Sequence, residues 1–143
     1  MRVMVIVKAT KDSEAGVGPT TELLRDMGNF NEQLVKAGLM LAGEGLKPSV
    51  KGKRATFRDG KVVFTDGPFA ETKELIAGFW LWQVKSMDEA VEWVRRCPNP
   101  MPGHEAQIEI RPVMEAEDFG EALTPEIRKQ EEMLRNQAPG QKK

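Results

Sequence analysis

Cysteine and histidine are almost missing from this sequence, since each occurs once among 143 residues, as Cys97 and His104. A single thiol cannot close an intrachain disulfide, and one cysteine with one distant histidine is too few ligands for a zinc site. We therefore expect no bound metal. Cys97 precedes Pro98 at the end of a helical pattern, and we interpret it as a small buried side chain rather than a reactive thiol.

Other absences narrow the function further. The formal net charge of −1 lacks the basic surplus typical of proteins that bind nucleic acid or anionic lipid. No stretch approaches the ~20 apolar residues of a membrane span, and the apolar start at residues 3–7 is too short for a signal peptide. Gly43-x-Gly45 is shorter than either glycine-rich phosphate-binding pattern, and no nucleophile motif is present. We expect a cytoplasmic protein with no nucleic acid, no membrane and no cofactor.

The hydrophobic pattern predicts alternating strands and helices in one main domain. A buried strand at 3–7 is followed by a loop at 11–18 and by a helix that Pro19 opens and Gly38 ends. Asp59-Gly60 between two alternating runs predicts a β-hairpin. Ser86 and Glu89 have capping-box spacing at the start of the second main helix. The remaining expected elements are strands at 39–46, 78–85 and 104–113, a helix at 125–136 and a disordered tail at 139–143.

This order gives two strand–helix–strand halves around one sheet. It predicts an α+β fold, a ferredoxin-like sandwich with an inserted hairpin. Two main helices cover one sheet face only, whereas the strand with Phe79, Trp80, Leu81 and Trp82 is apolar on both faces. Because monomers rarely leave such a face in water, we expect a homodimer in which sheet faces sheet.

A polar corner follows the hairpin at residues 65–74, Thr-Asp-Gly-Pro-Phe-Ala-Glu-Thr-Lys-Glu. Asp66 fits two roles: a cap that accepts backbone N–H groups in the turn, or an acid, base or anchor for a substrate. Glu71, Lys73 and Glu74 fit a solvated turn, although Lys73 also suits an acidic ligand.

Three further residues carry similar alternatives. Glu44, between two glycines, leaves room for a ligand or pairs with Arg54 or Lys47. Phe69 and Trp80 suit the core or the dimer interface, and they also suit the apolar floor of a pocket. We interpret His104 as a surface loop residue.

The string 43–48, Gly-Glu-Gly-Leu-Lys-Pro, together with the 65–74 corner, resembles the DGPF subgroup of the YCII-related proteins. Residues 108–113, Ile-Glu-Ile-Arg-Pro-Val, are similar to the strand that closes that domain. The resemblance covers residues 1–114, and 115–143 is similar to a helical extension of some members. It implies a ferredoxin-like fold that dimerises into an α/β barrel, with distant similarity to muconolactone isomerase and related dehalogenases.

The resemblance also implies a site. Asp66 matches the aspartate of an Asp–His pair proposed as catalytic in the wider family, whereas His104 does not align with its histidine. We expect a pocket around Asp66 that binds or transforms a small organic molecule. Asp66 is its predicted catalytic residue, and Glu44, Phe69, Glu71, Lys73 and Trp80 are its predicted substrate-binding residues. The alternative is a non-catalytic interaction or ligand-sensing protein linked to sigma-factor regulation, because such members are often encoded near sigma factors.

Overall fold

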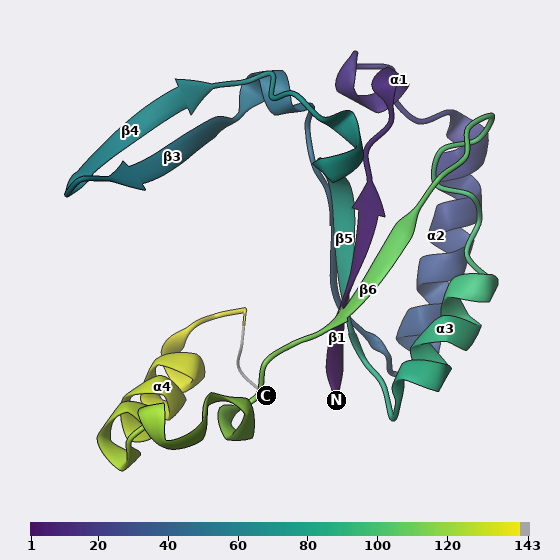
Figure 1. Cartoon of the computed structure of the whole chain (residues 1–143). Coiled ribbons are helices and arrows are strands. Elements are labelled where there is room, and N and C mark those ends of the chain that lie inside the picture. The colour runs from purple at the N-terminus through teal and green to yellow at the C-terminus, as the bar shows by residue number, and fades with distance from the viewer. Residues whose placement is uncertain (141–143) are drawn as a thin grey trace. The chain divides into compact units, whose positions relative to one another are not determined.

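The computed structural model describes residues 1–140, and the chain divides into two compact units, Met1–Pro112 and a second that begins at Val113 (Figure 1). Within residues 1–140, the six strands all belong to the first unit, and the regular elements of the second unit are helical. In order, the first unit comprises β1 (Arg2–Lys8), α1 (Lys11–Glu14), α2 (Thr21–Lys36), β2 (Met40–Gly45), η1 (Ser49–Lys51), β3 (Lys53–Arg58), β4 (Lys61–Asp66), η2 (Thr72–Glu74), β5 (Ile76–Gln83), α3 (Met87–Arg95) and β6 (Ile108–Pro112).

Four of these strands form an antiparallel sheet in the order β2-β5-β1-β6. The central strand β1 pairs Val5 with Trp80 of β5 on one side and with Ile110 of β6 on the other. β3 and β4 form a separate two-stranded sheet. The predicted α+β class is therefore confirmed, and β6 lies at one edge of the sheet.

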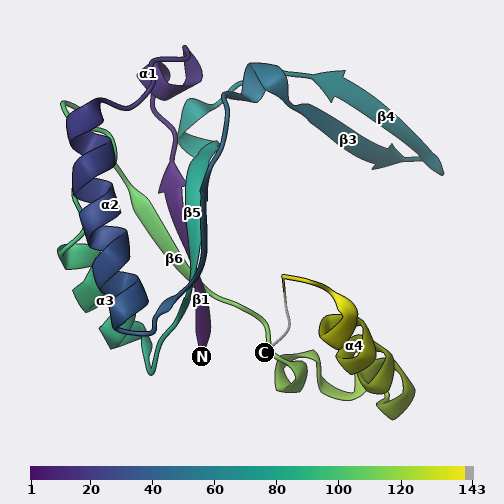
Figure 2. The ribbon, with the colours of Figure 1, turned by 180° about the vertical axis from the view of Figure 1, so that it is seen from behind.

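The two longer helices of the first unit, α2 and α3, cover the same face of the four-stranded sheet (Figures 1 and 2). Each begins where a hydroxyl caps it: Thr20 Oγ1 accepts from Leu23 N at 3.1 Å, and Ser86 Oγ accepts from Glu89 N at 3.2 Å. Their apolar stripes meet the sheet in one buried cluster, comprising Val3, Val5, Val7, Phe30, Leu34, Leu39, Trp80, Trp82, Val84 and Ala90.

Trp82 is the largest fully buried side chain in this core. Phe30 contacts both Trp80 and Trp82 edge-on, with ring centroids 6.0 and 6.3 Å apart. The Nε1 of Trp82 has no hydrogen-bond partner among the described residues. Hydrophobic packing therefore holds this indole in place without a polar anchor.

Side-chain alternation places a second apolar row on the other face of the sheet. Met4 lies beside Leu81, and Ile6 lies beside Phe79. Neither α2 nor α3 reaches this face; Met4 is 36% exposed and Phe79 and Leu81 are partly exposed, whereas Ile6 is buried. The predicted face that two helices cannot cover is therefore present in the first unit.

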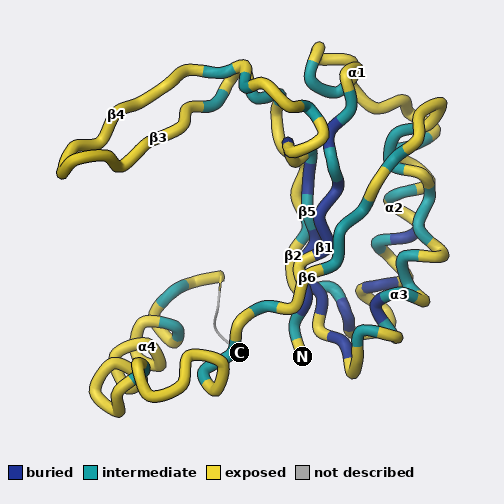
Figure 3. The backbone as a smooth tube through the Cα atoms, viewed as in Figure 1, coloured by how far each residue is buried: buried dark blue, intermediate teal, exposed yellow. Residues whose placement is uncertain are grey.

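The β3–β4 hairpin forms at the predicted Asp59-Gly60 turn. Both turn residues have positive φ, 51° and 73°, which is the geometry that Asp-Gly favours in a two-residue hairpin loop. The two strands extend away from the four-stranded sheet, and every residue in them is exposed (Figure 3).

Two local predictions were wrong. The expected loop at 11–18 contains α1, because Thr10 and Ser13 form a capping box in which each side chain accepts from the other's backbone N–H. The expected strand at 104–113 pairs only from Ile108, because a turn in which His104 N donates to Met101 O precedes it.

The second unit comprises η3 (Ala116–Ala122) and α4 (Pro125–Gln137). The helix predicted at 125–136 is confirmed as α4: Thr124 caps it, with Oγ1 accepting from Ile127 N at 3.3 Å, and Pro125 takes its first position. The larger apolar side chains of the second unit are exposed, namely Met114, Phe119, Ile127, Met133 and Leu134. Of the predicted tail, residues 141–143 lie outside the described residues.

Candidate functional site

The polar corner at 65–69 is built against the turn that precedes the hairpin. Gly67 N donates to Gly52 O at 3.0 Å, and Phe69 N donates to Ser49 Oγ at 3.1 Å. Both the N–H and the hydroxyl of Ser49 donate to the carboxylate of Glu14 in α1. Glycine is required at 67, since a Cβ there would lie 1.8 Å from Ser49 O. The corner therefore fastens the base of the hairpin to α1.

Asp66 points out from this corner. Its carboxylate pairs with Lys53 Nζ across the hairpin, and its side chain remains 75% exposed. No backbone N–H of the described residues donates to it, so the predicted turn cap is wrong. The strand register explains the difference, because Asp66 lies directly opposite Lys53. An ion pair this exposed contributes little stability, of the order of 0–1 kcal/mol.

The other predicted residues of the corner are also at the surface. Glu71 adopts a left-handed conformation with φ 65° at the start of η2, and Lys73 and Glu74 are exposed within that turn. Phe69 is covered by the guanidinium of Arg54, whose carbon lies 4.0 Å from the ring centroid. Phe69 thus has a structural contact, which anchors β3 to the corner.

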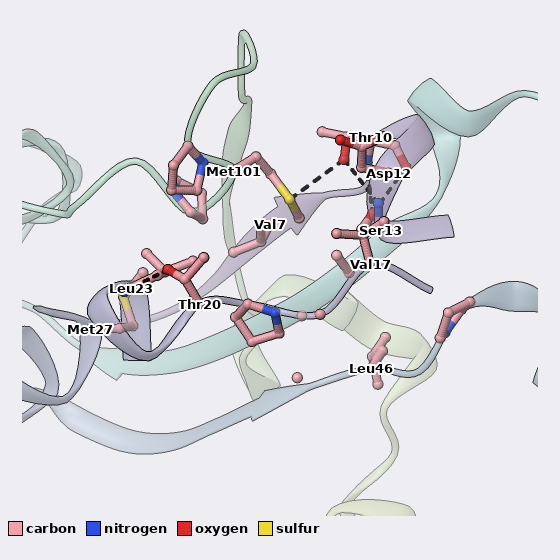
Figure 4. Close-up of a pocket in the computed structure, with 18 of the residues that line it drawn as sticks. Val7, Thr10, Asp12, Ser13, Val17, Thr20, Leu23, Met27, Leu46 and Met101 are labelled. Carbon is pink, nitrogen blue, oxygen red and sulfur yellow. Dashed lines mark hydrogen bonds between the residues drawn. The ribbon is translucent and has the colours of Figure 1, made fainter. Parts of the chain in front are cut away.

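A cavity of about 570 Å³ lies elsewhere in the first unit, between the sheet, the N-terminal end of α2 and two loops (Figure 4). Its lining is mainly apolar, and it includes Val7, Val17, Leu23, Met27, Leu46, Trp80 and Met101. Polar groups join from Thr10, Asp12, Ser13, Thr20, Asn31 and His104. Pockets for small molecules commonly have this size and this mixture.

Two of the predicted site residues, Glu44 and Trp80, line this cavity, whereas Asp66, Phe69, Glu71 and Lys73 do not. Trp80 Nε1 donates to Asn31 Oδ1 at 2.9 Å, which joins β5 to α2 at the cavity wall. Gly43 has no room for a side chain, because a Cβ would lie 2.8 Å from Trp80 Cδ1. Glu44, the next residue in the strand, projects to the opposite face, so its backbone is what faces the cavity.

Gly45 is different from Gly43. A Cβ at Gly45 would meet no heavy atom within 4 Å, although the residue lines the cavity. Gly43 comes two residues before Gly45 in β2, and alternate residues of a strand face the same side, so both glycines face the cavity side. The absent side chain at Gly45 therefore contributes open volume to the cavity.

A His–Asp pair lies in the cavity lining and joins two distant segments. His104 Nε2 lies 2.8 Å from Asp12 Oδ2, with side chains 38% and 57% exposed. Asp12 comes from α1, which the Thr10–Ser13 capping box holds in place. His104 ends a loop that is fixed by two bonds of Asn99: its Nδ2 donates to His104 O, and its Oδ1 accepts from Met101 N.

Sequence reasoning missed Asp12 and treated His104 as a surface loop residue. The two residues are 92 positions apart, and no motif surrounds either of them. The only available signal was that His104 is the sole histidine. A carboxylate bound to one imidazole nitrogen fixes the ring and its tautomer, an arrangement that acid–base chemistry uses.

Cys97 lies outside this site. Burial raises the pKa of its thiol to about 11, and the residue is half-buried, so the predicted small buried side chain is confirmed in part. Within residues 1–140, no three or more His, Cys, Asp or Glu side chains are grouped to hold a metal ion. None of the described helices has the length and apolar character to cross a membrane.

Comparison with known proteins identifies the family of this chain. The model of the YCII-related domain matches residues 1–117, which is most of the sequence. The chain belongs to the YCII-related family. An uncharacterized protein of Rhizobium meliloti (strain 1021) is 33% identical over 91 residues, covering 64% of this chain and 73% of that protein. The family predicted from the 43–48 and 65–74 strings is therefore confirmed.

Proposed function

We propose that this YCII-related protein binds a small, largely apolar organic molecule in the 570 Å³ cavity, with the Asp12–His104 pair as its polar end. The observation that carries the proposal is the coincidence of an apolar cavity with an oriented imidazole in its lining. Ligand sites are typically built in this way, from apolar walls and a few placed polar groups.

The polar groups of the lining indicate what the ligand offers. Asn31 Oδ1 is occupied by Trp80, and among the described residues none accepts from Asn31 Nδ2, so this amide has donors for a ligand. Asp12 brings a carboxylate to the lining, Glu44 contributes its backbone, and no lysine or arginine belongs to the lining. This composition favours a neutral or cationic ligand over the organic acid that Lys73 suggested.

For a chemical step, His104 is the residue we propose as acid or base. Asp12 would orient the imidazole, because its carboxylate contacts Nε2. Nδ1 is then the ring nitrogen that would exchange a proton with a ligand. The family-based prediction assigned this role to Asp66, and it stays a prediction. Because the two aspartates belong to separate places, substituting each one distinguishes the two assignments.

A second candidate is a non-catalytic protein that senses a ligand and contacts a partner. The exposed apolar side chains of the second unit support it, among them Phe119, Ile127 and Leu134. This candidate uses the same cavity and requires no reaction. It predicts binding of a ligand with no turnover.

We also propose the finer architecture that the sequence predicted. The strand order β2-β5-β1-β6 with two helices on one face supports a ferredoxin-like sandwich. The apolar row of Met4, Ile6, Phe79 and Leu81 supports a homodimer with sheet facing sheet, as in an α/β barrel. Sedimentation at micromolar concentration tests this homodimer, and a species of 16.0 kDa would contradict it.

A fluorescence titration with 1-aminoanthracene, a small aromatic amine, tests the binding site. We expect saturable binding to the parent protein and to Asp66→Asn, and about tenfold weaker binding to Gly45→Leu, whose side chain would fill open cavity volume. Gly45→Ala, the matched smaller change, should have an intermediate effect. Equal binding to all four proteins would reject the cavity, and loss of binding in Asp66→Asn alone would favour the polar corner.

A further inference from the structure

The β3–β4 hairpin is amphipathic, although nothing in the first unit lies against its apolar side. In the strand register, Ala55 lies opposite Phe64 and Phe57 lies opposite Val62, so these four share one face, here termed the arm face. The other face carries Arg54, Thr56, Arg58, Lys61, Val63 and Thr65. Alternation of this kind is typical of strands that cover something on one side.

The arm face is strongly exposed. Phe57 retains 80% of its exposure, Phe64 67% and Val62 47%. A two-stranded hairpin is marginally stable when isolated, and three or more strands or a packing partner are normally needed. The exposed phenylalanines therefore indicate that this hairpin is completed by a contact outside the first unit.

The base of the hairpin is held by several contacts, whereas its two strands are exposed along their whole length. Glu14 holds Ser49, Gly67 is bonded to Gly52, and Arg54 covers Phe69. These contacts hold the two strands away from the four-stranded sheet of their own unit (Figures 1 and 3). A hairpin anchored in this way can reach another molecule without reorganising its base.

We infer that the arm face binds the exposed sheet face of a second copy of this chain. The arm face suits an apolar partner, because the charges at its base, Lys53 and Asp66, neutralise each other. Every copy carries one arm face and one apolar sheet row, which includes Met4 and Leu81. A two-fold arrangement would cover both surfaces twice.

The areas agree with such a contact. An aromatic side chain buries roughly 150–250 Å², so Phe57 and Phe64 of one arm would bury roughly 300–500 Å². Two arms and the surface they cover would bury roughly 1,200–2,000 Å², which is the range of stable protein–protein interfaces. Contact between two arms is less favourable, because residues 53–66 contain four basic and two acidic side chains in each copy.

This inference rests on the proposed homodimer and adds the arm to it: the two sheets face each other, and each arm covers the end of the partner copy's row at Met4 and Leu81, beside the facing sheet. Adjacent valines of β4 give a matched test, because Val62 lies on the arm face and Val63 on the opposite face with similar exposure. By sedimentation equilibrium, Val62→Asp should weaken dimerisation of the full chain about tenfold or more, and Val63→Asp less than about threefold. Equal effects of the two substitutions, or none, would overturn the arm contact.

A covalent readout covers the case in which Val62→Asp does not fold. Phe57 is replaced by photoreactive p-benzoylphenylalanine in the full chain, and light and heavy isotope-labelled copies are mixed before irradiation. We expect cross-links between the two copies, from position 57 to peptides that contain Met4 or Leu81. Cross-links within one copy, or between two arms, would overturn the inference. A dimeric parent without arm cross-links rejects the arm alone, whereas a monomeric parent rejects the homodimer as well.

Discussion

The polar corner and the cavity each contain an aspartate with a basic partner, yet they are built in opposite ways. Asp66 pairs with Lys53 on an exposed hairpin, and its neighbours fasten that hairpin to α1. Asp12 pairs with His104 in the lining of an apolar cavity. The corner gathers its polar residues within ten positions of sequence, whereas the cavity gathers them from segments 92 positions apart. A dense polar motif therefore marks a structural joint here, and the better candidate site has no local motif.

The two regions also differ in the space around their glycines, and substituting these glycines gives the largest predicted effect on stability. Gly67→Ala should lower the free energy of unfolding by roughly 2–4 kcal/mol, because its Cβ would overlap Ser49 O. Gly45→Ala, in open cavity space, should change it by less than about 1 kcal/mol. Urea denaturation of both variants measures the difference. Equal stability losses would show that the corner is no more constrained than the cavity.

The half-buried thiol of Cys97 lies in neither region. With its pKa raised from 9.0 to about 11, Cys97 should react with iodoacetamide at pH 8 about 100-fold more slowly than an unperturbed thiol. Folding favours the neutral thiol, so its contribution to stability is complete below pH 9 and is lost as the pH rises to about 11. Labelling in urea-unfolded protein is the control. Rapid labelling of the folded chain would contradict burial of this side chain.

Filling the cavity tests its volume directly. Gly45→Leu should weaken 1-aminoanthracene binding about tenfold, since the leucine side chain would occupy space that is open beside Gly45. The melting temperature serves as the control for folding. Unchanged affinity in a folded variant would mean that the probe binds elsewhere.

The smallest effects distinguish the two aspartates. Replacing both Asp12 and His104 in a double-mutant cycle should give a coupling of roughly 0.5–1 kcal/mol in stability, because the pair is partly shielded. Asp66→Asn should cost less than about 0.5 kcal/mol, because its ion pair is exposed and screened by solvent. Thermal unfolding at low and high salt measures both. A loss of stability in Asp66→Asn that exceeds the Asp12–His104 coupling would mean that the exposed ion pair contributes more than the pair in the cavity lining.

The parts of the fold that local chemistry determines were predictable. Asp59-Gly60 specified the hairpin, Ser86 specified the start of α3, and Gly38, with φ 78°, specified the end of α2. These features depend on residues within a few positions of each other, which is the range that periodicity and capping rules cover.

The candidate site was less predictable because it depends on tertiary contacts. Glu44 and Trp80 were identified from their own surroundings, and both line the cavity. The Asp12–His104 pair forms only when α1 and the 98–107 loop come together, and no spacing rule connects them. The bond between Glu14 and Ser49 was equally absent from any pattern, so the structural use of the corner was not foreseen.

The most direct test of the central claim is a two-dimensional ¹H–¹⁵N NMR titration of the protein with 1-aminoanthracene. The Trp80 indole N–H, bonded to Asn31 in the cavity wall, provides a resolved reporter. We predict that shifts concentrate at the Trp80 indole and at the amides of Gly45 and His104. Saturable shifts concentrated at Asp66, Gly67 and Phe69, with the Trp80 indole unchanged, would contradict the claim.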